Sequence, residues 1–354
     1  MPEPVLARRK PFLVEIQAGK TYLWCACGRS QRQPFCDGSH RGTGFQPARF
    51  VAEQDREAVL CGCKHTRNAP FCDGSHNNLS DTYEEAGEDE IRASASIALA
   101  PRSAGDHGKA VLDGGCYVLT VSPAQLPESG SLRLTPVIDQ SDGAKFLSQF
   151  YAEVERGTTG IMQFPGREAV LFIADGAGLV SISGRDFPLR PETGVHVRPD
   201  EGFAISNRDA PPLKLLITVC PKIDGPQWLD VMPEVFDESI PRRVGAYDPA
   251  RREPMADRFY QVLIGKDSGS NQVTEFIGEI PRSRAAAHRH LYEEAIMILS
   301  GEGYLWTEHA RAQVQPGDII FLPRKQLHSL ECTSPQGMRL MGVFYPAGSP
   351  AVNY

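Results

Sequence analysis

The sequence lacks both a long hydrophobic segment and an excess of positive charge. No apolar run among its 354 residues approaches the roughly 20 residues that a membrane-spanning helix needs, and its first residues carry no apolar core of a secretory signal. The formal net charge of −7 at pH 7 argues against nonspecific binding to nucleic acid. We therefore expect neither a membrane nor a nucleic acid among the partners.

The cysteines also lack the pattern of a disulfide framework. Six of the nine belong to two short clusters, and the other three, Cys116, Cys220 and Cys332, are an odd and scattered set. Such a set suits a reducing compartment, so we expect a cytoplasmic protein. With 41% apolar and 23% charged residues, the composition is ordinary for a globular chain of two or three domains.

The two cysteine clusters repeat one pattern of candidate ligands. Each contains Cys-x-Cys followed by a third cysteine that begins Cys-x-x-x-His. Every ligand position of the first copy recurs 36 residues later. One unit has therefore been duplicated without insertion or deletion. Three thiolates and one imidazole can hold zinc in a closed site, or an iron–sulfur cluster with one histidine ligand. The candidate ligands are Cys25, Cys27, Cys36 and His40 in the first copy and Cys61, Cys63, Cys72 and His76 in the second.

Both copies end in Pro-Phe-Cys-Asp-Gly-Ser-His, and this pattern resembles the CDGSH iron–sulfur family. The resemblance implies that each ligand set holds a [2Fe–2S] cluster and that the two copies form an internal pseudo-dimer. Zinc stays the alternative, although zinc ribbons usually pair two Cys-x-x-Cys knuckles. A neutral imidazole ligand raises the cluster potential and can be protonated near physiological pH, so we expect acid-labile clusters with proton-coupled redox chemistry. Asp37 and Asp73 are expected to accept backbone N–H groups where a helix begins.

A second group of metal-ligating residue types lies near the other end of the chain. His288-Arg-His290-Leu-Tyr-Glu-Glu294 precedes a segment that begins at Gly317 and ends at His328. On a strand, His288, His290 and Glu294 point to one face because side chains alternate. The spacing resembles the two cupin motifs, which implies a barrel whose interior binds one divalent metal through these three residues and His328. Fe(II) is favoured, although Mn, Ni and Zn tolerate the same ligands.

The departures from the cupin pattern fall outside the ligand set. Lys325 stands where the second motif has a glycine, and a segment beginning at Pro281 replaces the first glycine of the other motif. These departures affect the local turns more than the metal. Arg284 and Arg289 are candidates for attracting a carboxylate. Four aromatic residues are expected, by strand position alone, to line the substrate pocket. These aromatic residues are Tyr292, Tyr304, Trp306 and Phe321.

Residues 161–220 resemble a degenerate copy of the same barrel. When Gly176 is aligned with Gly301, Ala169 takes the position of Glu294, and no His-x-His pair precedes it. We therefore expect this first barrel to have lost its metal and to serve packing and homodimerisation.

Short β-like runs between glycine and proline turns fill the chain beyond residue 110, a pattern typical of barrels and sandwiches. We predict a mainly β fold in which a small two-cluster CDGSH domain is followed by two cupin barrels of the double-stranded β-helix, or jelly-roll, type. The predicted bounds are 1–100, ending in an acidic linker, 101–235 for the degenerate cupin and 236–354 for the metal-binding cupin. Only residues 145–156 read as an amphipathic helix.

The fusion of these parts is the main clue to function. A [2Fe–2S] cluster carries one electron at a time, and iron in an open site of histidines and glutamate can bind and activate oxygen. By analogy with enzymes that pair a Rieske cluster with mononuclear iron, we expect an oxygenase of a small-molecule substrate. Its electrons would be relayed through the clusters from a partner reductase. Two alternatives stay open: a cupin dioxygenase or isomerase with structural or regulatory clusters, or a non-enzymatic redox, iron or pH sensor.

Overall fold

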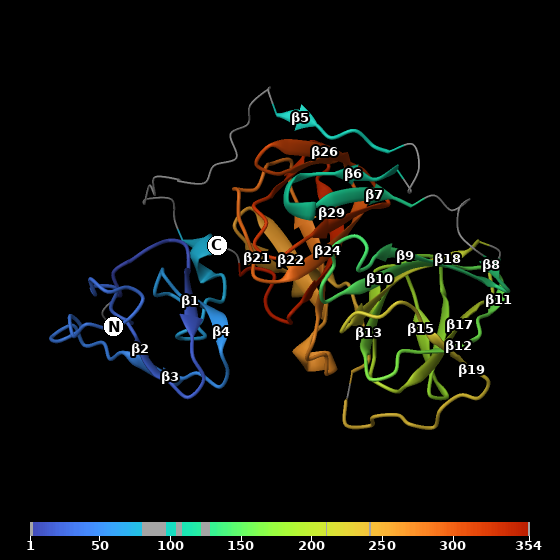
Figure 1. Cartoon of the computed structure of the whole chain (residues 1–354), viewed down its shortest axis with the longest axis horizontal. Helices are drawn as coiled ribbons and strands as arrows, with labels where there is room; N and C mark the ends of the chain where they lie inside the picture. Colours follow the sequence, from blue (N-terminus) through green and yellow to red (C-terminus); the bar gives the residue numbers. More distant parts are fainter. Residues whose placement is uncertain are drawn as a thin grey trace.

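The structure, a computed structural model, describes residues 3–79, 97–103, 108–121, 128–209, 211–240 and 242–352. These residues form β-strands and short 3-10 turns, and none of them lies in an α-helix. The predicted mainly β fold is confirmed, with a small N-terminal unit followed by two barrels (Figure 1). In the part of the chain described here, no helix is long and apolar enough to cross a membrane. The acidic stretch predicted as a linker lies outside the described residues.

The N-terminal unit is built on two antiparallel strand pairs. β1 (Phe12–Ile16) pairs with β4 (Arg56–Leu60), and β2 (Thr21–Trp24) pairs with β3 (Ala48–Val51). The first cysteine motif follows β2 and the second follows β4, so the duplication is visible in the fold. Each motif folds back onto the strand before it, through one isolated bridge per copy. These bridges join Trp24 to Phe35 and Leu60 to Phe71.

The first barrel consists of two antiparallel sheets. Their strand orders are β20-β16-β13-β18-β10-β9-β8 and β15-β14-β17-β12-β19, with β11 beside β17. Side chains from both sheets fill its core. The strands are β8 (Glu128–Ser129), β9 (Leu132–Ile138), β10 (Ser148–Val154), β11 (Gly157–Thr158), β12 (Ile161–Gln163), β13 (Glu168–Asp175), β14 (Gly178–Ile182), β15 (Arg185–Leu189), β16 (Thr193–Val197), β17 (Gly202–Asn207), β18 (Leu213–Cys220), β19 (Gln227–Leu229) and β20 (Val244–Ala246).

The second barrel has the sheet orders β21-β22-β23-β29-β24-β27-β7-β6 and β28-β25-β26-β5. Three of these strands, β5 to β7, precede the first barrel in the chain and yet complete the second. The predicted domain bounds stay predictions. The strands are β5 (Ala98–Leu99), β6 (Ala110–Val111), β7 (Tyr117–Thr120), β21 (Glu253–Met255), β22 (Arg258–Ile264), β23 (Thr274–Ile280), β24 (Glu293–Ser300), β25 (Gly303–Trp306), β26 (Ala310–Val314), β27 (Asp318–Leu322), β28 (Ser329–Cys332) and β29 (Met338–Tyr345).

Residues 145–156 do not form a helix, so that prediction was wrong. Ser148–Val154 form β10, a strand buried along its whole length between β9 and β18. Phe150 packs in the core of the first barrel, whereas Tyr151 packs in a second core shared by the two barrels. A strand that is buried on both faces does not alternate between apolar and polar residues, so apolar periodicity no longer separates it from a helix.

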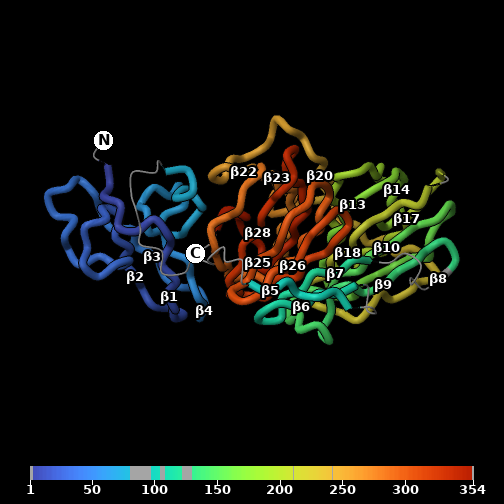
Figure 2. Tube along the Cα trace, turned by 90° about the horizontal axis from the view of Figure 1, so that it is seen from above, coloured from blue at the N-terminus to red at the C-terminus, as the bar shows by residue number. Residues whose placement is uncertain are grey.

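The N-terminal unit packs against the second barrel. Its second motif, in the lighter blue, faces the barrel, whereas the first motif lies on the far side (Figures 1 and 2). Asn77 Nδ2 donates to Ala351 O at 3.0 Å, and Lys325 Nζ lies 2.7 Å from the Glu57 carboxylate. Lys325 has φ 66°, so it keeps the left-handed backbone of the glycine that it replaces and uses its side chain to hold the N-terminal unit.

Candidate metal centre and cluster sites

Three histidines converge inside the second barrel. His288 and His328 face each other across a pair of backbone hydrogen bonds, and their ring centroids are 4.4 Å apart. His288, His290 and His328 each offer one ring nitrogen as a ligand atom, and these three atoms lie within 4.8 Å of one another. His290 and His328 are 1% and 3% exposed. This is the arrangement that one metal ion requires of its imidazole ligands.

Backbone carbonyls fix the protonation of the three imidazoles. His288 Nδ1 donates to Ala286 O at 2.9 Å, and His328 Nδ1 donates to Gln326 O at 2.9 Å. His290 Nδ1 donates to Tyr292 O at 3.1 Å. Because a carbonyl oxygen only accepts, each Nδ1 carries the proton and each Nε2 keeps its lone pair. Outer-shell bonds of this kind orient metal-ligating histidines, so the residues present fit a metal.

Glu294, the fourth predicted ligand, lies beside His290 but is not within 4.8 Å of all three histidines. It lies on β24, is 5% exposed, and places Oε2 3.0 Å from His290 Nε2. The two atoms miss hydrogen-bond geometry, and His290 Nε2 has no hydrogen-bond partner among the described residues. A divalent cation bound between the His290 imidazole and the Glu294 carboxylate would give both buried groups a partner.

The surroundings keep His288 and His328 neutral. Burial, and then the neighbouring His290, lowers the pKa of His288 to about 4. Burial, and then His288, lowers the pKa of His328 well below its ordinary value. Neutral imidazole is the form that binds metals, so protons do not compete for these two ligands at neutral pH.

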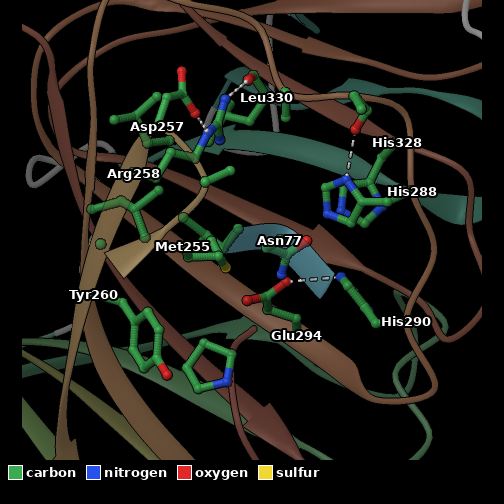
Figure 3. Close-up of a pocket in the computed structure, with 18 of the residues that line it drawn as sticks. Asn77, Met255, Asp257, Arg258, Tyr260, His288, His290, Glu294, His328 and Leu330 are labelled. Atoms are coloured by element: carbon green, nitrogen blue, oxygen red, sulfur yellow. Dashed lines mark hydrogen bonds and ion pairs between the residues drawn. The ribbon is translucent and has the colours of Figure 1, made fainter. Parts of the chain in front are cut away.

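The histidines border a cavity of about 520 Å³ that opens between the barrel and the N-terminal unit. His288, His290, His328 and Glu294 lie along one side of it, and Arg258 lies on the other (Figure 3). Arg258 has a side chain only 11% exposed, and its guanidinium donates to Leu330 O at 3.2 Å. Most of the remaining wall is apolar. It includes Met255, Phe276, Ile296, Leu305, Leu322 and Leu340.

The N-terminal unit contributes its own wall to this cavity. Arg9, Lys10, His76 and Asn77 line it together with the barrel residues. His76 and Asn77 belong to a 3-10 turn, Ser75–Asn78, that directly follows the Cys-Asp-Gly of the second motif. A candidate cluster ligand therefore lies at the edge of the candidate metal site, which sequence reasoning did not foresee.

The aromatic residues predicted to line the pocket have different positions. Tyr292 lines the cavity, with its ring 3.9 Å from that of His290 between centroids. Phe321 instead packs on Tyr117 in the core shared by the barrels, at 5.3 Å between centroids. Tyr304 and Trp306 are also not among the cavity residues, and Arg284, which is, lies over the Trp306 ring. The neighbours Leu305 and Leu322 face the cavity instead, because a one-residue error in strand parity exchanges the two faces.

The candidate ligands of each CDGSH motif form two pairs. In the first motif, Cys25 Sγ and Cys27 Sγ are 3.7 Å apart, and Cys36 Sγ is 3.1 Å from His40 Nδ1. In the second motif, the corresponding separations are 3.5 Å and 3.4 Å. Within the described residues, no three of these eight side chains bring ligand atoms within 4.8 Å of one another. An arrangement in two pairs fits a cluster of two metal ions, each with two protein ligands. It fits a single zinc ion less well, because such an ion needs all four ligands around one centre.

The two motifs differ in burial. Cys72 and His76 are 7% and 5% exposed, whereas their counterparts Cys36 and His40 are partly exposed. The hydrogen bond between Cys61 and Cys63 lowers the pKa of the Cys61 thiol to about 6 and raises the pKa of the Cys63 thiol, so one thiolate of this pair is favoured in the absence of metal. The second site is therefore enclosed and the first lies at the surface.

The Asp-Gly-Ser links accept backbone N–H groups as predicted, although no α-helix follows them. Asp37 accepts from Gln31 N at 2.8 Å and Ser39 N at 3.0 Å, and Asp73 makes the equivalent bonds in the second copy. The short 3-10 turn after the second motif has Gly74 as its N-cap, without a side-chain cap bond. The aspartates therefore stabilise the ligand loops themselves.

Known families match two parts of the chain. The model of the iron-binding zinc finger CDGSH type matches residues 6–41 and 46–77, and the cupin domain model matches residues 279–344. CDGSH iron-sulfur domain-containing protein 3, mitochondrial, from Mus musculus is 54% identical over 54 residues, which are 15% of this chain and 39% of that protein. The Homo sapiens protein of the same name is 56% identical over 54 residues, 15% of this chain and 42% of its own length. The match thus spans about two fifths of these curated relatives.

Solved structures resemble the barrels. Protein Ylba from E. coli has a TM-score of 0.52 and 16% identity, and the match covers 67% of this chain and 93% of that one. A putative glyoxylate-induced protein from Pseudomonas aeruginosa has a TM-score of 0.53 and 14% identity, covering 71% and 96%. A mutant of Bacillus subtilis oxalate decarboxylase has a TM-score of 0.52 and 13% identity, covering 66% and 79%. At these identities the likeness shows the fold alone. The chain carries two CDGSH-type motifs joined to a pair of cupin barrels, the second of which holds the convergent histidines.

Proposed function

We propose that the protein is an oxygenase of a small-molecule substrate, in which a cupin metal receives electrons relayed by two [2Fe–2S] clusters of the same chain. One observation carries the proposal: His76, a candidate cluster ligand, lines the same cavity as His288, His290 and His328. A cluster site used only for stability has no need to border the metal site, whereas a one-electron donor is useful only close to its acceptor.

Each cluster would be held by one Cys-x-Cys pair and one Cys and His pair. When bound, such a cluster supplies or accepts one electron at a time. The enclosed second site lies on the cavity side, and the partly exposed first site lies away from it. This order supports a path that begins at the surface, passes the second motif and ends at the barrel.

Buried groups of the chain connect the two cluster sites. The Trp24 side chain, next to Cys25 in sequence, donates its indole N–H to Cys61 O at 2.9 Å. Lys64 Nζ donates to the same carbonyl at 3.1 Å and lies 4.7 Å from the Trp24 ring centroid. Lys64 is 6% exposed, and its charge acts on the thiols of both motifs. Burial lowers the pKa of Lys64, whereas the thiolates of both motifs act to raise it. In its protonated form Lys64 would offset the negative charge that each added electron brings to either site.

The barrel would hold Fe(II) through His288, His290, His328 and Glu294. When bound with an open position, such a metal supplies a site for activating oxygen or substrate. The apolar wall excludes water from the reacting groups. Arg258 Nη2 donates to Leu330 O and Arg258 Nε lies 3.5 Å from Asp257, and the remaining guanidinium N–H groups can bind a carboxylate or similar anion on the substrate. Mn, Ni or Zn in the barrel would favour redox-neutral chemistry such as decarboxylation or isomerisation.

Metal analysis of protein purified without oxygen tests the assignment of the sites. We expect two irons and two sulfides for each cluster, together with one mononuclear Fe(II) that gives an EPR signal with nitric oxide. The matched variant His328→Ala is expected to lose only the mononuclear metal. Zinc in the barrel of the wild-type protein would contradict the oxygenase.

Oxygen consumption tests the electron relay. Wild-type protein loaded with iron is expected to consume oxygen only when an external reductant is present, and His328→Ala is expected to lose this activity with its clusters intact. The variant Cys36→Ser/Cys72→Ser, which loses both clusters, is expected to lose it as well. Full turnover of that variant with oxygen and no reductant would exclude the relay. Binding of a ligand without turnover in every preparation would instead favour a sensor.

A further inference from the structure

We infer that the first CDGSH motif is the docking surface for an acidic one-electron donor protein, and that Arg29, Arg32 and Arg41 are the residues that recognise it. The inference rests on the proposed function, since electrons for the barrel then have to enter from outside the chain. It names the kind of reductase that the sequence leaves open.

The three arginines are close in sequence to the ligands of the first cluster site. Arg29 and Arg32 lie in the loop that joins Cys27 to Cys36, and Arg41 directly follows His40. All three are exposed, and none of them forms an ion pair with another described residue. The motif itself places only one acidic side chain, Asp37, among them, and Asp37 accepts two backbone N–H groups of the same loop. Their charges therefore face solvent.

The duplication provides an internal comparison for this patch. The positions 36 residues later hold His65, Asn68 and Asn77, so the second copy has none of the three arginines. Two of those positions are exposed as well, so exposure alone does not place arginine there. Asn77 lines the cavity and donates to Ala351 O, because this copy packs against the barrel. Two changes go the other way: Lys64 replaces Gly28 and is buried, and Arg67 replaces Gln31 and lies 3.8 Å from Asp73.

The charge of the whole molecule makes the patch distinct. Residues 3–79 contain eleven Lys and Arg against seven Asp and Glu, whereas the complete chain has a net charge of −7. A basic unit on an acidic protein orients an acidic partner toward that unit and repels it elsewhere. The partly exposed Cys36 and His40 lie between Arg32 and Arg41 in the sequence, so a donor that docks on these arginines would approach the cluster ligands.

The step at this surface is a single electron transfer. The reduced centre of the donor loses one electron, the cluster held at Cys36 and His40 gains it, and no bond forms or breaks. The co-reactant is an acidic protein that carries one electron at a time, such as one with an iron–sulfur or flavin centre.

Stopped-flow reduction of the clusters tests the docking surface. The probe is a reduced plant-type [2Fe–2S] ferredoxin, an acidic protein whose potential near −400 mV lies below that of clusters with histidine ligands. The variant Arg29→Glu/Arg32→Glu/Arg41→Glu is compared with Arg190→Glu/Arg208→Glu/Arg251→Glu, which changes the net charge equally through exposed arginines of the barrels. The visible spectrum of each variant shows whether its clusters are present before mixing.

The motif variant is expected to be reduced about 10- to 100-fold more slowly than wild type at about 10 mM salt, and the barrel variant within about threefold of wild type. High salt should bring all three proteins to similar rates, and a small uncharged quinol should reduce all three equally. Equal slowing of both variants, or no slowing of the motif variant at low salt, would overturn the inference. Cluster reduction is read without any turnover in the barrel, so failure here differs from failure of the proposed function.

Discussion

Replacing Gly74 by alanine tests how closely the second motif is held against the barrel. Gly74 has φ +84°, and a Cβ built there lies 2.4 Å from Ala351 Cβ and 2.7 Å from Ala351 O. The counterpart Gly38 has φ +95°, with nothing within 4 Å of such a Cβ. Gly38→Ala therefore carries the same backbone strain without the contact, which makes it the matched control.

The two substitutions differ by the cost of the contact. Each pays roughly 1–2 kcal/mol for placing a Cβ in the left-handed region. Gly74→Ala adds an overpacking cost of about 1–3 kcal/mol, because the atoms in its way are backbone and a short side chain. The cost is lowest if the N-terminal unit moves off the barrel, so the extra free energy should appear as undocking. Hydrogen exchange at residues 346–352, with thermal unfolding, measures both effects.

Gly74→Ala is expected to raise hydrogen exchange in that segment and to lower the unfolding temperature more than Gly38→Ala. Both variants should keep the visible cluster spectrum. Equal exchange in the two variants would refute the close packing of the second motif on residues near Ala351. The shared cavity, and with it the main support for the relay, would then be lost.

Three other perturbations follow from the structure. His328→Ala should abolish metal binding in the barrel while the cluster spectrum is unchanged, as metal analysis can check; retention of the mononuclear metal would contradict the ligand set. Glu293→Ala removes the carboxylate that accepts N–H groups from Lys145, Phe146 and Leu147 at 3.0–3.1 Å, and should cost about 2–3 kcal/mol in denaturant unfolding, with Glu293→Gln milder. Although burial opposes the shift, hydrogen bonds from Arg243 lower the pKa of Glu201, so wild type should lose stability as pH falls below the ordinary glutamate range. The variant Arg243→Met should be less stable than wild type at neutral pH, and its stability should fall less as the pH is lowered. A pH dependence of stability equal to that of wild type would contradict a lowered pKa of Glu201.

The ligand sets could be predicted from the sequence because their chemistry is local. Each set lies within 16 residues of chain in the CDGSH motifs, and strand parity places His288, His290 and Glu294 on one face. The structure brings His288, His290 and His328 together, and it pairs the two cysteines of each Cys-x-Cys and the cysteine and histidine of each Cys-x-x-x-His. His328 comes from elsewhere in the chain, and its place was implied only by the cupin resemblance.

The rest depends on contacts between distant segments, which local patterns do not encode. Parity could not tell which face of β25 and β27 looks into the cavity, so Tyr304 and Phe321 were predicted there in place of Leu305 and Leu322. The strand at 148–154 is buried on both faces because two cores meet at it, and its sequence resembled a helix. His76 borders the metal site because the N-terminal unit packs on the barrel. The sequence gives one sign of this packing, Lys325, which stands at a glycine position.

The most direct test of the relay measures the proximity of each cluster to the cupin metal. Reduced clusters can be studied by EPR power saturation with and without Fe(II) and nitric oxide in the barrel. The structure predicts faster relaxation of one cluster when the nitrosyl is present, an effect that Cys36→Ser keeps and Cys72→Ser removes. Unchanged relaxation of both clusters, or an effect confined to the cluster at Cys36 and His40, would contradict a relay through the second motif.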